Sequence, residues 1–146
     1  MKIISKVTAL LALALFAGCA GQTGGGMAPS TGKALSITTP ITMANVSSPL
    51  KVCMATNGFT VEPAKKGVNP GKGHHHLIID EGLPADLSLP VAKDGTHIHM
   101  GDGSTCKTIE LSKGQHTITA LFAQGNHVPY SPAVTDSVTV RVVHVD

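Results

Sequence analysis

The sequence predicts an all-β domain: an antiparallel β-sandwich of immunoglobulin-like or cupredoxin-like shape with seven or eight short strands. Short segments alternate apolar and polar residues, which is the two-residue period of a half-buried strand. Gly, Pro, Asn and Asp residues separate these segments at short intervals. Beyond the N-terminus, no segment shows the 3.6-residue period of an amphipathic helix. A small closed barrel is the main alternative fold.

The predicted strands follow one another at close spacing along the folded part of the chain. Each is bounded by turn-forming residues. We expect strands over residues 35–38, 50–54, 59–61, 74–80, 96–100, 106–111, 115–123 and 137–145. Asn57-Gly58 predicts a tight hairpin between the second and third of them. Pro84 and Pro90 bracket a segment that we expect to be a loop rather than a central strand.

The size and composition of the chain indicate one domain. Residues 34–146 are enough for a single core and too few for two. The chain has no Trp and one Tyr, so Val, Ile, Leu and Ala must fill that core. We therefore expect a single His-rich β domain over residues 34–146.

The N-terminus has the pattern of an export signal over residues 1–18. Lys2 and Lys6 precede an apolar run, residues 7–17, that is too short to span a bilayer. The run ends in Leu-Phe-Ala-Gly before Cys19, which resembles a bacterial lipobox, although Phe16 replaces the usual smaller aliphatic residue. We expect lipidation of Cys19; an ordinary secretory signal that is cut near Ala20 is the alternative.

Residues 19–33 are expected to tether the domain to the lipid. They are rich in Gly, Ser, Thr and Pro and have little to bury. No aspartate follows Cys19, which by resemblance to Gram-negative sorting favours an outer-membrane lipoprotein that faces the periplasm; a secreted periplasmic protein is the alternative. The expected partner is the lipid bilayer, through the anchor, and an envelope protein partner stays open.

The charge of the chain argues against nucleic-acid binding. The full chain carries 11 Lys and Arg against 9 Asp and Glu. Removal of the signal takes away Lys2 and Lys6, which leaves the mature protein close to neutral apart from its histidines. Arg141 is the only arginine, so the chain has no basic cluster for phosphates.

Cysteine usage agrees with export. With Cys19 assigned to lipid, Cys53 and Cys106 remain as an even pair in an oxidising compartment. We expect a disulfide between them. Two separate buried thiols, or soft ligands in a metal site, are the alternatives.

Two histidine pairs suggest a metal site. Side chains two residues apart in a strand project from the same face, so His74 pairs with His76, and His97 with His99. If the two strands are neighbours, four imidazoles can converge. Imidazole is the commonest metal ligand, and an all-nitrogen set suits Zn²⁺ or Cu²⁺, with the Irving–Williams order favouring copper. His127 is a further candidate ligand.

The histidines also have a structural interpretation. His75 shares its face with Leu77 and Ile79, so we expect a hydrogen-bonded core residue rather than a ligand. We expect His116 to support the core in the same way. A structural hydrogen-bond network is the alternative for the candidate ligands themselves.

The ordered series of motifs resembles the domain of unknown function 4399 family. The series is GHHHLIID at 73–80, HIHMGDG at 97–103, LSKGQHT at 111–117 and HVPY at 127–130, within a match over about residues 50–143. Members are commonly exported bacterial proteins, and the family has no established activity, so the resemblance implies a fold and little mechanism. This chain departs from the common pattern in its two cysteines. It also has Gln-Gly-Asn before His127, where an acidic residue is expected.

The leading hypothesis is a lipid-anchored periplasmic domain that binds copper or zinc through His74, His76, His97 and His99, with His127 as a further ligand, for metal buffering or delivery. The alternative is a non-catalytic interaction module of the cell envelope whose histidines are structural. The sequence contains no recognisable catalytic constellation. A metal-dependent hydrolase with one position open to water is the third and weakest hypothesis.

Overall fold

The structure is a computed structural model, and it describes residues 32–145. The predicted signal peptide, the lipidation site Cys19 and most of the predicted tether lie outside the described residues. Within residues 32–145, no helix has the length and apolar character needed to cross a bilayer.

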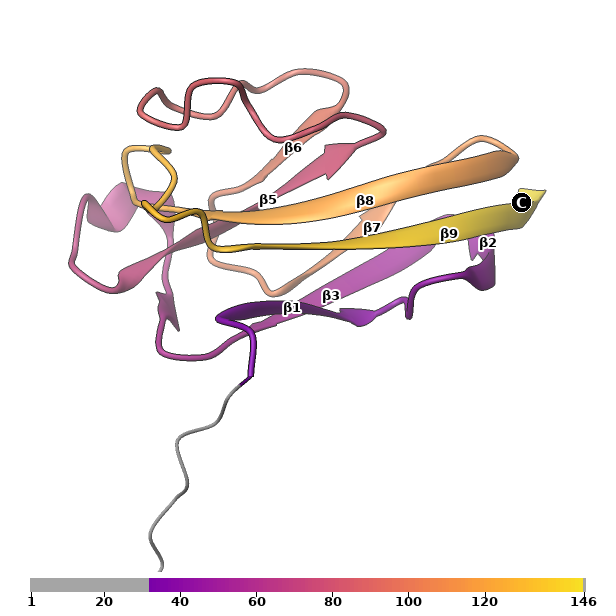
Figure 1. The fold of residues 1–146 in the computed structure, drawn as a ribbon, viewed down its shortest axis with the longest axis horizontal. Helices are drawn as coiled ribbons and strands as arrows, with labels where there is room; N and C mark the ends of the chain where they lie inside the picture. Colours follow the sequence, from indigo (N-terminus) through magenta and orange to yellow (C-terminus); the bar gives the residue numbers. More distant parts are fainter. Residues whose placement is uncertain (1–31, 146) are drawn as a thin grey trace, which may run out of the picture. The chain divides into compact units, whose positions relative to one another are not determined.

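The described residues form two β-sheets, which confirms the predicted all-β sandwich (Figure 1). The smaller sheet has the order β1-β3-β7; the larger has the order β2-β9-β8-β5-β4, with β6 also paired to β5. The strands are β1 (Leu35–Thr39), β2 (Ala44–Ser48), β3 (Leu50–Thr56), β4 (Thr60–Val61), β5 (Lys72–Ile79), β6 (His97–Met100), β7 (Cys106–Ile109), β8 (Gly114–Ala123) and β9 (Thr135–Val145). A 3₁₀ turn, η1 (Ala64–Lys66), follows β4.

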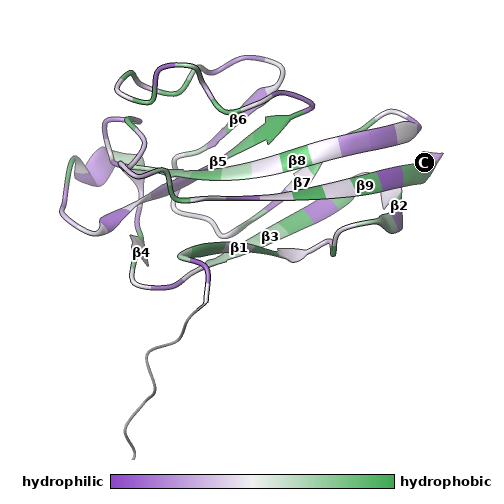
Figure 2. Ribbon diagram, in the orientation of Figure 1, coloured by the Kyte–Doolittle hydropathy of each residue, from purple (hydrophilic) through white to green (hydrophobic). Residues whose placement is uncertain are grey.

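The main core lies between the two sheets. Alternate residues of each strand face inward, such as Leu77 and Ile79 from β5 and Ile118 and Phe122 from β8, and they pack with Val52 of β3. Aliphatic side chains dominate this core, as the composition predicted. Figure 2 shows the hydrophobic residues along β1, β3, β5 and β9.

Three features of the sheet pairing differ from the prediction. The predicted hairpin at Asn57-Gly58 is wrong, because β4 pairs in parallel with the start of β5 and not with β3. The sheets are mostly antiparallel, but β2 also pairs in parallel with β9. The strand Ala44–Ser48 was not predicted, since its single large apolar residue, Val46, gives no clear alternation.

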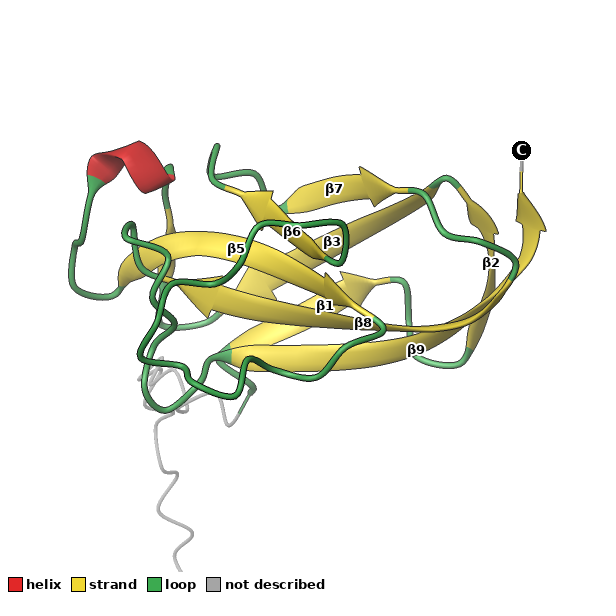
Figure 3. Cartoon of the chain, turned by 90° about the horizontal axis from the view of Figure 1, so that it is seen from above, coloured by secondary structure: helices red, strands yellow, loops and turns green. Residues whose placement is uncertain are grey.

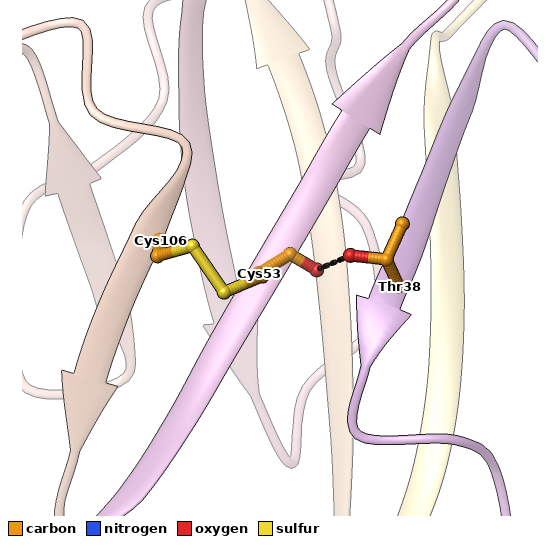
Figure 4. The surroundings of a disulfide bond; sticks show 3 residues. All are labelled: Thr38, Cys53 and Cys106. Atoms are coloured by element: carbon orange, nitrogen blue, oxygen red, sulfur yellow. Dashed lines mark hydrogen bonds between the residues drawn. A yellow bond between two sulfur atoms is a disulfide. The ribbon is translucent and has the colours of Figure 1, made fainter.

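The predicted disulfide is confirmed. Cys53 and Cys106 lie opposite each other in the antiparallel β3–β7 pair and are bonded. Figure 4 shows this bond, together with the hydrogen bond that the Thr38 hydroxyl donates to the carbonyl of Cys53 at 3.2 Å. The disulfide therefore joins two neighbouring strands, and β1 pairs with the other edge of β3.

The predicted loop between the proline residues crosses the outer face of the larger sheet. Residues 80–96 contain no strand or helix and run over β5 and β8 (Figures 1 and 3). Val91 in this loop packs with Ile78 of β5 and Leu121 of β8 in a second, smaller apolar cluster. The outer face of β5 is therefore covered and not solvated, which explains why every residue of β5 after Lys72 is buried.

Candidate metal centre

β5 and β6 bring two predicted histidine pairs to the same outer face. The strands are antiparallel, with His76 opposite His99 and Ile78 opposite His97. His74 and His76 are fully buried on this face. The two strands are therefore neighbours, as the sequence-based prediction assumed.

His127 reaches this face from a turn at the end of β8. Ala123, the last residue of β8, pairs with His74, so the chain leaves β8 beside that histidine. In the turn, the backbone N–H of His127 donates to the Gln124 carbonyl at 2.8 Å, and Val91 donates its N–H to the His127 carbonyl at 2.9 Å. The backbone of His127 has a φ of 69°, in the left-handed region that non-glycine residues seldom occupy. A strained backbone is thus held in place around this imidazole.

Four imidazoles meet at this point, and we call His74, His76, His99 and His127 the four-histidine cluster. The Nε2 atoms of His74 and His76 are 3.0 Å apart, and those of His99 and His127 are 3.1 Å apart. Ligand atoms of His74, His99 and His127 all lie within 4.8 Å of one another. Three separate chain segments, β5, β6 and the turn after β8, contribute to the cluster.

His97 is the predicted ligand that the structure does not place in the cluster. It lies on the same face one step further along β6, but its Nδ1 is 2.9 Å from a carboxylate oxygen of Asp94, in the loop over the sheet. Its Nε2 faces the Glu81 carboxylate at 3.9 Å. Strand alternation places His97 on the correct face, but the ring turns toward these two carboxylates.

The surroundings of His74, His76 and His99 favour the neutral form of these imidazoles. Burial, with the charges of His99, His127 and His75, lowers the pKa of His74 to about 4. Burial, with the charges of neighbouring histidines, lowers the pKa of His76 to about 3. Burial also lowers the pKa of His99. Neutral imidazole is the form that binds metals, so these rings need to lose no proton to bind an ion near pH 7.

The hydrogen bonding within the cluster is incomplete. Within the described residues, Nδ1 of His74 and Nδ1 of His76 are buried without a partner. A buried polar atom without a partner costs about 1–3 kcal/mol, so native proteins keep few of them without a reason. As a purely structural network, the cluster would therefore lower the stability of the fold.

One segment, residues 60–67, contacts the chain next to three of the cluster histidines. Glu62 donates its N–H to the carbonyl of Gly73, just before His74, at 2.7 Å, and Ala64 donates to the carbonyl of Gly101, just after β6, at 2.9 Å. The carbonyl of Gly67 lies so close to Gly125 that a β-carbon there would be 2.0 Å from it. Sequence reasoning missed this support, although a glycine within two residues of each of these histidines was a visible signal.

Two other histidines have structural environments. His75 faces the core, with its ring centroid 5.2 Å from that of Phe122. Neither of its ring nitrogens has a partner within the described residues, so the expected hydrogen-bonded core histidine is wrong in that respect. His116 places Nδ1 2.6 Å from Asp80 Oδ2 and Nε2 2.9 Å from the Ser112 carbonyl.

Comparison with known proteins places the chain in a family. The family described as Domain of unknown function (DUF4399) matches residues 52–143, more than half of the chain. This match confirms the resemblance that the motifs predicted, and it spans all four histidines of the cluster. No curated protein and no solved structure matches the chain.

Proposed function

We propose that this chain, which belongs to the DUF4399 family, binds a single transition-metal ion, copper or zinc, through its four-histidine cluster. The observation that carries the proposal is the convergence of four imidazoles from three chain segments, with Nε2–Nε2 separations of 3.0 and 3.1 Å. A tetrahedral ion with metal–nitrogen bonds of about 2.0–2.1 Å holds its ligand nitrogens about 3.3–3.4 Å apart. The His74–His76 and His99–His127 pairs are therefore within a few tenths of an ångström of this spacing, and the nitrogens of the two pairs would move toward each other to bind the ion.

The alternative, a structural histidine network in an envelope interaction module, explains fewer of these contacts. A structural network gives no reason for four imidazoles to meet through their Nε2 atoms, and it leaves Nδ1 of His74 and Nδ1 of His76 without a partner within residues 32–145, as an ion bound at Nε2 also would. Apolar side chains at the same positions would fill the space without that cost. The binding of an ion supplies a reason to keep four imidazoles at this point.

The absence of a recognised catalytic constellation favours metal buffering or delivery over catalysis. Three acidic residues near the cluster histidines in sequence are engaged elsewhere: Asp80 contacts His116, Asp102 accepts hydrogen bonds from Ser104, and Asp94 accepts them from Thr96 and His97. The site is therefore better suited to binding an ion than to catalysis.

The proposed location is the periplasmic face of the outer membrane, through a lipid on Cys19. The lipobox-like sequence before this residue supports the proposal. Growth of expressing cells with a labelled fatty acid tests it: the label should enter the wild-type protein and should be lost in a Cys19→Ser variant. Equal labelling of the two proteins would contradict lipidation at this residue.

Calorimetric titration of the purified protein with Cu²⁺ and with Zn²⁺ tests the metal site. We expect one ion per chain at micromolar or tighter affinity in the wild type, and loss of that binding in His74→Ala/His76→Ala. His75→Leu is the matched control, because this buried residue lies between the two on the same strand and faces the opposite way. Equally weak binding by the wild type and the double variant would contradict the proposal.

A further inference from the structure

We infer that the four-histidine cluster is built for a tetrahedral ion, specifically Zn²⁺, and that the four imidazoles fill its whole coordination sphere. This inference rests on the proposed function and identifies the ion. It makes the site a closed one that retains zinc, rather than a site with a position for water or substrate.

The arrangement of the four rings is close to tetrahedral. In a regular tetrahedron all six centroid separations are equal, whereas in a square two of them exceed the other four by a factor of about 1.4. The six separations are 4.9 Å (His74–His76), 4.9 Å (His74–His99), 5.0 Å (His74–His127), 5.2 Å (His76–His99), 5.9 Å (His76–His127) and 4.7 Å (His99–His127). In a square, the two diagonals join different pairs of rings and are both long. Here only the His76–His127 separation is long, and the separation of the other two rings, His74 and His99, is 4.9 Å.

The size of the cluster also fits. An imidazole that binds through Nε2 at about 2.0–2.1 Å places its ring centroid about 3.2 Å from the ion, so four tetrahedral imidazoles have centroids about 5.2 Å apart. A square-planar set would give about 4.5 Å along its edges and about 6.4 Å across its diagonals. The observed range of 4.7 to 5.9 Å surrounds the tetrahedral value and stays below the square diagonal.

The cluster is also held firmly enough for its geometry to select an ion. His74 and His76 lie on β5, which has paired strands on both sides. His127 is fixed by the backbone hydrogen bonds to Gln124 and Val91. The backbone that carries these rings is thereby fixed, so we expect ions that prefer square-planar or octahedral surroundings to bind less well.

The donor atoms distinguish Zn²⁺ from Cu⁺, which also accepts tetrahedral sites. Cu⁺ favours soft sulfur ligands. The two methionines nearest in sequence to candidate ligand strands, Met54 and Met100, are buried in the main core between the sheets and not on the outer face that holds the cluster. Cys53 and Cys106 are joined to each other. The cluster is therefore a nitrogen-only site, which suits zinc.

Titration of the purified full chain with Zn²⁺, Co²⁺ and Ni²⁺ tests the inference. For an unconstrained nitrogen site, the Irving–Williams order makes Ni²⁺ bind more tightly than Co²⁺. A rigid tetrahedral site should reverse this order, with Co²⁺ bound at least about tenfold more tightly than Ni²⁺ and Zn²⁺ more tightly than both. The Co²⁺ form should also show the intense visible absorption of a tetrahedral complex.

The outcomes separate this inference from the proposed function. Tighter binding of Ni²⁺ than of Co²⁺, or a weak octahedral-type cobalt spectrum, would overturn the tetrahedral zinc site and leave metal binding itself standing. Failure of all three ions to bind more tightly to the wild type than to His74→Ala/His76→Ala would overturn the zinc site, and the same failure with Cu²⁺ would overturn the proposed function as well. His97→Ala should leave the Zn²⁺ affinity unchanged, because His97 lies outside the cluster; a loss equal to that of the double variant would contradict the four-ligand assignment.

Discussion

Gly101 lies directly beneath the imidazole of His99. A β-carbon at position 101 would be 2.1 Å from Cε1 and 2.2 Å from Nε2 of that ring. Continuation of the β5–β6 register past Met100 puts Gly101 opposite His74. The missing side chain therefore leaves the space into which the His99 ring leans, and there it approaches His74 with a centroid separation of 4.9 Å.

Gly101→Ala should weaken metal binding while it leaves the fold intact. The added methyl group must displace the His99 ring, which can rotate toward solvent without moving the backbone. We expect the Zn²⁺ affinity to fall by about 10–100-fold, the range seen when the support of a metal ligand is removed. Competition with a chromophoric chelator measures this change.

Gly95→Ala is the matched control for that variant, since no atom lies within 4 Å of a β-carbon there. It should bind Zn²⁺ like the wild type. In a His99→Ala background, Gly101→Ala should have no further effect on affinity, because the ring that it displaces is gone. Additive losses in the double variant would show that Gly101 acts by another route.

His127→Asn should separate stability from metal binding. Asn tolerates a φ near 69° better than most residues, and the backbone hydrogen bonds of the turn do not need the imidazole. In chelator we expect the free energy of unfolding to stay within about 0.5 kcal/mol of the wild type or to rise. The Zn²⁺ affinity should fall at least about tenfold with the loss of one of four ligands. Urea unfolding and a chelator competition measure the two effects; a protein that keeps its affinity would exclude His127 as a ligand.

Strand alternation predicted much of this site from the sequence. A two-residue period places His74, His76, His97 and His99 on the outer faces of their strands and His75 on the core face, and the structure agrees. The pairing of β5 with β6 was an assumption, because single-sequence patterns do not determine which strands are neighbours. In the structure the two strands do pair, and His76 lies opposite His99.

The remaining features of the site depend on contacts that no local pattern encodes. His97 and His99 have the same place in the alternation, yet Asp94 in the loop binds the ring of the first, and Gly101 makes room for the ring of the second. The burial of the cluster follows from the loop over the sheet, whose docking through Val91 is a tertiary contact. The strand Ala44–Ser48 is likewise defined by its pairing with β9 rather than by its own composition.

His75→Leu should stabilise the protein. The imidazole is fully buried, and neither ring nitrogen has a hydrogen-bond partner within the described part of the chain. Leucine has a similar volume and no polar atom to desolvate, so we expect a gain of about 1–3 kcal/mol in the free energy of unfolding. Urea unfolding in chelator measures it, and the Zn²⁺ affinity should not change. A loss of stability would indicate an unseen partner for His75, such as a buried water molecule.

Removal of the disulfide should lower stability but leave the metal site intact. Cys53 and Cys106 are 53 residues apart in the chain, so in the chain-entropy model their bond contributes about 4 kcal/mol. Cys53→Ala/Cys106→Ala should lose a stability of this order in thermal or urea unfolding, without new thiols that could bind metal. Because the bond joins β3 to β7 in the smaller sheet, and the cluster lies on the larger sheet, the Zn²⁺ affinity of the folded variant should match the wild type. A fall in affinity would show that the two sheets are coupled.

The pair of Asp80 and His116 should make stability depend on pH. Burial lowers the pKa of the His116 imidazole, but its hydrogen bonds to the Asp80 carboxylate and the Ser112 carbonyl, together with the carboxylate charge, raise it overall. A raised pKa in the folded state means that the stabilisation is fully present below the unfolded value of about 6.5 and is lost as the pH rises through the folded pKa.

Asp80→Asn is a clean test, because Asn accepts the positive φ at this position and can still accept the hydrogen bond from the Thr117 N–H. In chelator we expect the variant to be less stable than the wild type by about 0.5–1 kcal/mol at pH 6, since the Asp80 side chain is 47% exposed and its charge is screened. The difference should shrink toward zero by pH 9. Urea unfolding at the two pH values measures it, with Asp86→Asn, a substitution in the exposed loop, as the control; a difference that stays constant or grows with pH would exclude an ionic contribution from this pair.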